Sequence, residues 1–173
     1  MTHLRLVYAE QRHLATFMPD IRPLDNEEWV AGTGMSTRAG LHAVITVHPN
    51  SSWAVVGNNE DCWALWGVTP PVQRFVEFRG VAWMVASKKA QRNLHAMHRL
   101  FNQGISDMHK LYPHLEAWAY APNTLHHRWM ERFGWQRTGK VRSFALPGFG
   151  FVQFHRSREV TPSADYHYYG GHA

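Results

Sequence analysis

Three basic residues mark the point where an apolar stretch gives way to a long amphipathic one. Residues 86–93 read Ala-Ser-Lys-Lys-Ala-Gln-Arg-Asn, and a helix is expected to begin there. The free N–H groups and the dipole of a helix N-terminus attract anions. Lys88, Lys89 and Arg92 would add positive charge beside Ser87, so this stretch could bind a phosphate group. A capped helix start with solvated lysines is the simpler interpretation.

Side chains that could move a proton occur at two further places. Asp61 ends the polar break at residues 58–61, while Tyr120 and His126 lie on either side of Asn123, which is expected to open a helix. A carboxylate can take a proton from an amine, and a tyrosine or histidine can return one to a leaving group. Aspartate is also common in turns for backbone reasons alone, so Asp61 has a purely structural alternative.

Histidines are numerous, but their spacing does not predict a metal site. His95 and His98 are three residues apart on the long amphipathic stretch, and His126 and His127 are adjacent. Zinc sites usually need three or four ligands, and no cysteine or aspartate completes a recognisable spacing. The single cysteine, Cys62, is interpreted as a small buried residue, and it fits a reducing compartment.

Length and composition favour one domain. The chain has 173 residues, 45% of them hydrophobic, with eight tryptophans and nine phenylalanines, so a substantial core is expected. No run approaches the ~20 apolar residues of a membrane span, and no signal peptide is recognised. We therefore expect a soluble intracellular protein. The net charge of +5 permits contact with nucleic acid, but the basic residues are scattered and form no known nucleic-acid motif.

The elements that would position these residues alternate between strands and helices. Asp25, with Glu28 three residues on, is interpreted as a capping box that starts a helix ending at Gly32 or Gly34. Ser36 is expected to cap the next helix. Strands are predicted at residues 4–9, 53–57, 62–69, 80–86, 115–120, 136–144 and 149–154, and helices at 11–17, 25–34, 36–47, 88–111 and 123–133. The unbroken apolar run at 80–86 predicts a central strand covered on both faces.

This order of elements, together with three motifs, resembles the GCN5-related N-acetyltransferase (GNAT) fold. The motifs are Asp61-Cys62-Trp63-Ala64-Leu65-Trp66-Gly67, Ala82-Trp83-Met84-Val85-Ala86-Ser87, and residues 118–135, where Asn123 opens a helix that Gly134-Trp135 closes. The resemblance covers residues 4–154. It implies an α/β (α+β) domain over residues 1–156, with a mixed, mostly antiparallel sheet flanked by helices. The parallel strands would lie near 80–87 and 115–120, with a V-shaped cleft between them.

The same resemblance shows what this chain lacks. Enzymes of the family hold acetyl-CoA at a glycine-rich turn, but residues 86–93 contain no glycine. Many use a tyrosine seven residues after the helix-opening asparagine as general acid, and Met130 stands there. If acetyl-CoA binds, the resemblance assigns its contacts to Ser87, Lys88, Lys89, Arg92 and Asn123.

More narrowly, the chain resembles the internal virion protein A family of T7-like podophages. That resemblance implies a virion or virion-assembly protein that uses the fold as an interaction module without catalysis or cofactor. It would act in the host cytoplasm during assembly or inside the virion. Its polar tail, residues 157–173, would bind other virion proteins or a second copy of the chain. The alternatives are an acetyl-CoA-dependent N-acetyltransferase with a divergent cofactor site and, third, a nucleic-acid-binding protein.

Overall fold

The computed structural model describes residues 3–71 and 78–158 of the chain. The strands are β1 (Arg5–Tyr8), β2 (Ser52–Val56), β3 (Cys62–Thr69), β4 (Arg79–Ala86), β5 (His114–Tyr120), β6 (Gln136–Arg142) and β7 (Phe151–Ser157). The helices are α1 (Gln11–Phe17), α2 (Pro23–Thr33), α3 (Thr37–Val47), α4 (Lys88–Arg92), α5 (Leu94–Leu111) and α6 (Thr124–Arg132), with single 3-10 turns η1 (Met18–Asp20) and η2 (Pro49–Ser51). Almost all of the predicted C-terminal tail lies outside the described residues.

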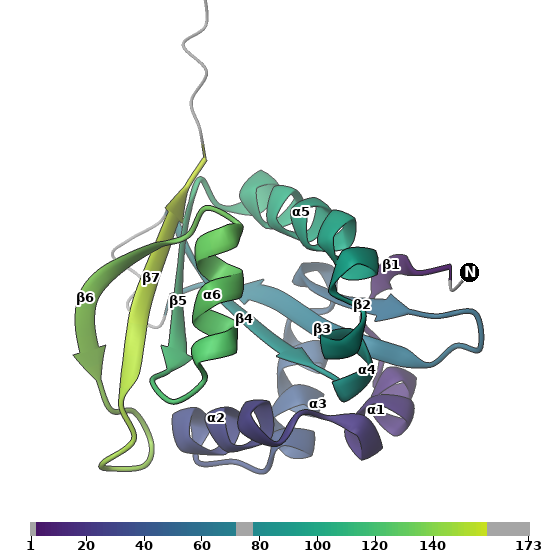
Figure 1. Ribbon diagram of the computed structural model, residues 1–173, viewed down its shortest axis with the longest axis horizontal. Coiled ribbons are helices and arrows are strands. Elements are labelled where there is room, and N and C mark those ends of the chain that lie inside the picture. Colours follow the sequence, from purple (N-terminus) through teal and green to yellow (C-terminus); the bar gives the residue numbers. More distant parts are fainter. Residues whose placement is uncertain (1–2, 72–77, 159–173) are drawn as a thin grey trace, which may run out of the picture.

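The strands form one sheet in the order β1-β2-β3-β4-β5-β7-β6 (Figure 1). Neighbouring strands pair antiparallel except for β4 and β5, which are parallel. The predicted mixed, mostly antiparallel sheet with its one parallel pair is therefore confirmed.

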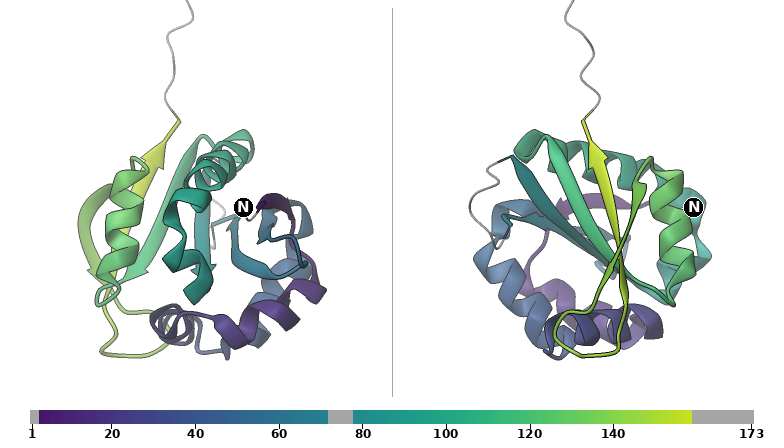
Figure 2. Two further views of the ribbon diagram at one scale, coloured as in Figure 1. Left: turned by 45° about the vertical axis from the view of Figure 1, so that its right-hand side comes forward. Right: turned by 90° about the vertical axis from the view of Figure 1, so that its left-hand side faces the viewer.

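Helices cover both faces of the sheet (Figure 2). On one face, α5 and α6 pack Met97 and Trp129 against a cluster that includes Trp66. On the other face, α1, α2 and α3 surround a second cluster that includes Leu41 and Leu65. None of the helices in the described part of the chain is long and apolar enough to cross a membrane.

Local signals in the N-terminal half predict most of its elements correctly. The Ser36 hydroxyl accepts the backbone N–H of Ala39 and begins α3, as expected. Strands β2 and β3 form the predicted hairpin around the polar break. The capping box predicted from Asp25 and Glu28 is wrong, because α2 begins earlier, with Arg22 at its N-cap and Pro23 in its first turn. Both carboxylates instead reach backbone groups of the sheet.

The single helix predicted for residues 88–111 is divided into α4 and α5. Asn93 interrupts it with φ −126° and ψ 46°. Its side-chain amide donates to the Lys89 carbonyl at 2.9 Å, so a local side-chain bond replaces the helical pattern there. The predicted apolar stripe holds in the middle, where Met97 is fully buried, but Leu94 and Leu111 at its ends are 37% and 49% exposed.

The central strand departs from its prediction in one respect. Residues 80–86 were expected to be covered on both faces, and β4 does occupy the middle of the sheet. Yet residues 81–84 are only half-buried. The reason is that backbone pairing between β4 and β5 ends at Val81 and Glu116, after which the strands separate.

Candidate functional site

The separation of β4 from β5 creates a strand gap between residues 82–86 and 117–120. Pairing runs from Arg79 opposite His114 to Val81 opposite Glu116, and none continues along the rest of these two described strands. Backbone polar groups alternate in direction along a strand. Because the Ala86 N–H points away from β3, the N–H of Met84, two residues earlier on the same strand edge, faces the strand gap as well.

Helix α2 crosses the wide end of the strand gap and bonds to both strands. Asp25 Oδ2 accepts the backbone N–H of Ala86 at 2.7 Å. One helical turn later, Glu28 Oε1 accepts the backbone N–H of Tyr120 at 3.1 Å. Two carboxylates therefore take the place of a neighbouring strand at the ends of β4 and β5.

A buried polar network fills the space between α2, α4 and α6. Arg22 is only 3% exposed and forms an ion pair with Asp25, with Nη1 3.0 Å from Oδ1. It also donates two hydrogen bonds, from Nη2 to Asn123 Oδ1 at 3.0 Å and from Nε to Gln91 Oε1 at 3.1 Å. Its guanidinium also stacks over the Trp129 ring, 5.4 Å from the centroid. Arg22 thus closes the strand gap on its α4 side. Burial raises the pKa of Asp25, although the ion pair opposes this.

Asn123 is the hub of this network. The residue is fully buried, and its amide nitrogen donates to Asp25 Oδ1 at 3.1 Å and to Glu28 Oε2 at 2.7 Å. Since Arg22 occupies its oxygen, every polar atom of the Asn123 side chain already has a protein partner. The sequence-predicted contact of Asn123 with a cofactor would therefore require this network to rearrange.

His126 and Glu28 form an acid–base pair, with His126 Nδ1 3.4 Å from Glu28 Oε2. Burial disfavours the imidazolium, yet the Glu28 carboxylate, with Asp25 beyond it, raises the pKa of His126. Burial would raise the pKa of Glu28, but His126 and the N–H donors of Asn123 and Tyr120 lower it overall. Each member of the pair therefore stabilises the charged form of the other.

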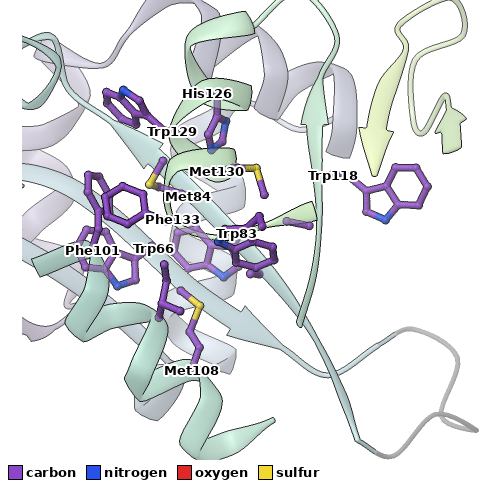
Figure 3. A pocket seen from close by; sticks show the side chains of 14 residues that line it. Trp66, Trp83, Met84, Phe101, Met108, Trp118, His126, Trp129, Met130 and Phe133 are labelled. Atoms are coloured by element: carbon purple, nitrogen blue, oxygen red, sulfur yellow. The ribbon is translucent and has the colours of Figure 1, made fainter. Parts of the chain in front are cut away.

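Two cavities flank the strand gap. The inner cavity, of about 80 Å³, lies on the α5–α6 face and is lined by His126, Trp129 and Met130 among others (Figure 3). The outer cavity, of about 560 Å³, lies on the α2–α3 face and is lined by Glu28. Both cavities share Ala82, Trp83, Met84 and Trp118. His126 therefore lines the inner cavity, and its partner Glu28 lines the outer one.

The sequence-predicted phosphate site is only partly available. Ser87 is buried and caps α4, its hydroxyl accepting the Ala90 N–H at 3.1 Å. The Lys89 N–H donates to Asp20 Oδ2 at 3.1 Å. A protein carboxylate thus occupies a position at the helix start that a phosphate would need.

The basic side chains around α4 are exposed. Lys88 and Arg92 are solvent-accessible, whereas the Lys89 ammonium forms an ion pair with Asp61. Burial tends to raise the pKa of Asp61, but Lys89 and the Trp63 indole N–H lower it. Asp61 lines neither cavity, so the structure places this predicted base apart from the strand gap.

Tyr120, the other acid–base candidate, also lines neither cavity. Its hydroxyl donates to Glu27 Oε1 at 2.8 Å, and this bond raises the pKa of Tyr120. Of the three catalytic candidates from the sequence, only His126 lines one of the two cavities. Among the described residues there is no group of three or more histidine, cysteine or carboxylate side chains that could hold a metal ion.

Sequence reasoning missed three residues of this site: Arg22, Asp25 and Glu28. Asp25 and Glu28 had been assigned to a capping box, which has the same spacing as two carboxylates on one helix face. An arginine directly before Pro23 and three residues before an aspartate was the available signal for an ion pair. Nothing local indicates that their partners lie about a hundred residues away, at Asn123.

Solved structures that share this fold include acetyltransferases. A GNAT-family acetyltransferase from Bacillus anthracis has a TM-score of 0.66 at 14% identity, over 91% of this chain and 96% of that one. A GCN5-related N-acetyltransferase from Kribbella flavida has a TM-score of 0.66 at 15% identity, over 89% and 97%. Spermidine N-acetyltransferase from Vibrio cholerae, solved with CoA and spermine, has a TM-score of 0.65 at 13% identity, over 90% and 95%.

The fold is that of the GNAT acetyltransferases. Identities this low establish the shared fold and nothing finer. The sequence matches no protein-family model, and no curated protein matches it. These neighbours give no support to the phage part of the sequence resemblance.

An acyl-CoA, the cofactor that this fold implies, fits the site in part. Its thioester arm suits the strand gap, where Met84 has no strand partner on the β5 side. The inner cavity is bordered there by Met84 and Met130, whose flexible side chains can make room. Its diphosphate does not suit the start of α4, because N–H groups there already donate to Asp20 and Ser87. The phosphates would instead bind the exposed side chains of Lys88 and Arg92.

Proposed function

We propose that this chain is an N-acyltransferase that moves an acyl group from a CoA-type thioester to an amine. The observation that carries the proposal is the His126–Glu28 pair beside the strand gap. His126 lines the inner cavity, and Glu28 lines the outer cavity. The GNAT fold of the solved neighbours supports it. The donor would lie on the inner-cavity side, and the amine would approach through the outer cavity.

The chain's part in this reaction is to move one proton. A bound donor supplies the acyl group; a C–N bond forms, the C–S bond breaks, and a proton must pass from the amine to the thiolate. Glu28, facing the outer cavity, accepts the amine proton, while the imidazolium of His126 gives its Nε2 proton on the inner side. The neutral His126 keeps its Nδ1 proton toward Glu28. The pair therefore returns to its starting state when Glu28 releases the amine proton through the outer cavity and His126 Nε2 takes up a proton from solvent. Backbone N–H groups such as that of Met84 are the donors available to an acyl oxygen.

The proposal is tested with the intact chain in an acetyl-CoA assay that follows thiol release in the presence of amines. His126→Gln should lower kcat about 100-fold, the lower end expected for loss of a general acid. Its affinity for acetyl-CoA, measured by calorimetry, should stay within about threefold of that of the unmodified chain, a difference of under 1 kcal/mol. A variant that retains full turnover would remove His126 from the mechanism.

A second candidate is a non-catalytic module with the same fold, which includes the virion or virion-assembly role implied by the sequence resemblance. Two observations favour it: Arg22 closes the α4 side of the strand gap, and Met130 cannot donate a proton. Calorimetric titration with acetyl-CoA separates the candidates. Binding in the micromolar range supports the enzyme, and no binding at millimolar concentration supports the module.

A further inference from the structure

The outer cavity has aromatic walls. Trp29 and Trp83 meet edge to face, with centroids 5.6 Å apart and planes at 84°. On the opposite side, Phe144 packs edge to face against Trp118 at 5.2 Å and against Phe151 at 5.1 Å. All five rings border the cavity, and its volume of about 560 Å³ falls in the range typical of small-molecule sites, roughly 300–1,000 Å³.

Two carboxylates line the same cavity, and each is paired with a cationic group that lies outside the lining, Asp25 with Arg22 and Glu28 with His126. Asp25 and Glu28 line it, whereas no lysine or arginine appears among its described lining residues. Each of the two guanidinium groups that touch lining residues already has a partner among them. Arg22 pairs with Asp25, and Arg142 stacks over the Phe144 and Trp118 rings at 4.4 Å and 5.6 Å.

The carboxylate of Glu28 still has room for another donor. It accepts bonds from the Tyr120 N–H and the Asn123 amide and lies near His126, yet its side chain remains 12% exposed. An ionised carboxylate offers about four acceptor positions, so a further ammonium N–H can be accommodated. Aromatic faces next to that carboxylate would also attract a cation through their π-systems.

We propose that the outer cavity binds primary amines with an aromatic or bulky apolar body. The ammonium lies toward Glu28, and the body lies among Trp29, Trp83 and Trp118. That these amines are acyl acceptors rests on the proposed function, whereas their binding does not. A linear polyamine fits less well, because its second cation would enter the apolar wall and lose solvation.

The probes are phenethylamine, its uncharged counterpart phenethyl alcohol, and the small diamine putrescine, each titrated calorimetrically into the intact chain without donor. Phenethylamine should bind at least about tenfold more tightly than either of the others, as expected for one charge-assisted hydrogen bond. Equal affinities for phenethylamine and phenethyl alcohol would overturn the proposal, and so would a failure of phenethylamine to bind.

Two helix α3 variants locate the site. Ala43 lines the outer cavity at an exposed helical position, so Ala43→Trp should fill the cavity and abolish phenethylamine binding while the chain still folds. Ala39, one turn earlier and also exposed, lines a different groove, and Ala39→Trp should leave binding unchanged. Equal effects of the two variants would place the amine elsewhere.

Failure of this inference and failure of the proposed function give different results. Phenethylamine binding without acetyl transfer would support the proposed amine site and contradict the proposed N-acyltransferase function. Acetyl transfer to polar amines alone would support the N-acyltransferase function and contradict the proposed preference for aromatic or bulky apolar amines. Glu28→Gln adds a further check, because it should reduce affinity for phenethylamine about tenfold and leave that for phenethyl alcohol unchanged.

Discussion

Asp25 and Glu28 lie one turn apart on α2, and each accepts the backbone N–H of a different strand. Asp25 bonds to Ala86 at the end of β4, and Glu28 bonds to Tyr120 at the end of β5. The two carboxylates span the distance that opens once the parallel strands separate. Helix α2 therefore helps to build the site as well as to cover the sheet.

Removal of the Asp25 carboxylate should strongly destabilise the chain. In Asp25→Ala, the Arg22 guanidinium and the Ala86 N–H lose a buried partner, and breaking a buried ion pair costs about 3–5 kcal/mol. Urea unfolding followed by tryptophan fluorescence measures the loss. In the control Asp107→Ala, the partner Lys110 is 71% exposed, so the change should stay below about 1 kcal/mol. Similar small losses in both variants would argue against the buried network.

The His126–Glu28 pair should make part of the stability depend on pH. The pKa of His126 in the fold lies above its ordinary value of 6.5. Its stabilisation is therefore fully present below about pH 6.5 and is lost as the pH rises through the folded-state value. The difference in unfolding free energy between the unmodified chain and His126→Gln should be largest below about pH 6.5 and shrink as the pH rises above it.

His127 provides the matched control for that measurement. It is adjacent in sequence, but burial, aided by Arg137, lowers the pKa of His127, and its Nε2 lies 3.0 Å from the Tyr120 carbonyl. The stabilisation from a histidine that is neutral in the fold is lost as the pH falls. The His127→Gln difference should therefore shrink toward acid pH, opposite to that of His126→Gln. Parallel profiles for the two variants would contradict the assigned charge states.

Gly104 should not tolerate alanine, although it lies inside a helix. A Cβ at Gly104 would sit 2.4 Å from Nε1 of Trp66, whose ring is 2% exposed and packs on α5. Alanine normally gains about 1 kcal/mol over glycine in a helix, so a loss of stability would reveal the clash. The control is Gly32→Ala in α2, where a Cβ meets only Phe151 at 3.4 Å. Thermal unfolding should show a lower midpoint for Gly104→Ala and an equal or higher one for Gly32→Ala.

The nucleotide of the acyl donor should contribute little to turnover. N–H groups of α4 already donate to Asp20 and Ser87, so they are not free for a diphosphate. Acetyl-pantetheine, which lacks the nucleotide, should therefore have a kcat/KM within about tenfold of that for acetyl-CoA, a difference of about 1.4 kcal/mol.

The Asp20→Asn variant tests the reason for that result. It removes a negative charge next to the Lys89 N–H, and should raise the affinity for acetyl-CoA more than that for acetyl-pantetheine. If the unmodified chain strongly preferred acetyl-CoA over acetyl-pantetheine, the Asp20 carboxylate would have to leave the Lys89 N–H and be replaced there by a phosphate when the donor binds.

Local signals predicted the elements and their order well. The Ser36 cap, the hairpin around the polar break and the apolar run of β4 each depend on a few neighbouring residues, and each appears in the structure. The helix break at Asn93 was missed because hydrophobic spacing continues across it. A side-chain bond from Asn93 to Lys89 decides that position instead.

The site was much less predictable than the fold. Of its central pair, His126 was proposed from its place beside a helix start, whereas Glu28 was assigned to a cap. The distinction depends on contacts between segments that lie far apart in the chain, such as Glu28 with Tyr120 and Asn123. Helical spacing shows that Asp25 and Glu28 share a face, but it does not show which element that face meets.

The early end of the β4–β5 pairing divides the sheet into two half-sheets, β1–β4 and β5–β7–β6. Three residue pairs join them at one end, and the α2 carboxylates join them at the other. Rotation of one half-sheet against the other about this short seam would widen both cavities without breaking either half-sheet. The amide protons of Ala86 and Tyr120 would then exchange with solvent through the same opening, and their similar protection would report its free energy.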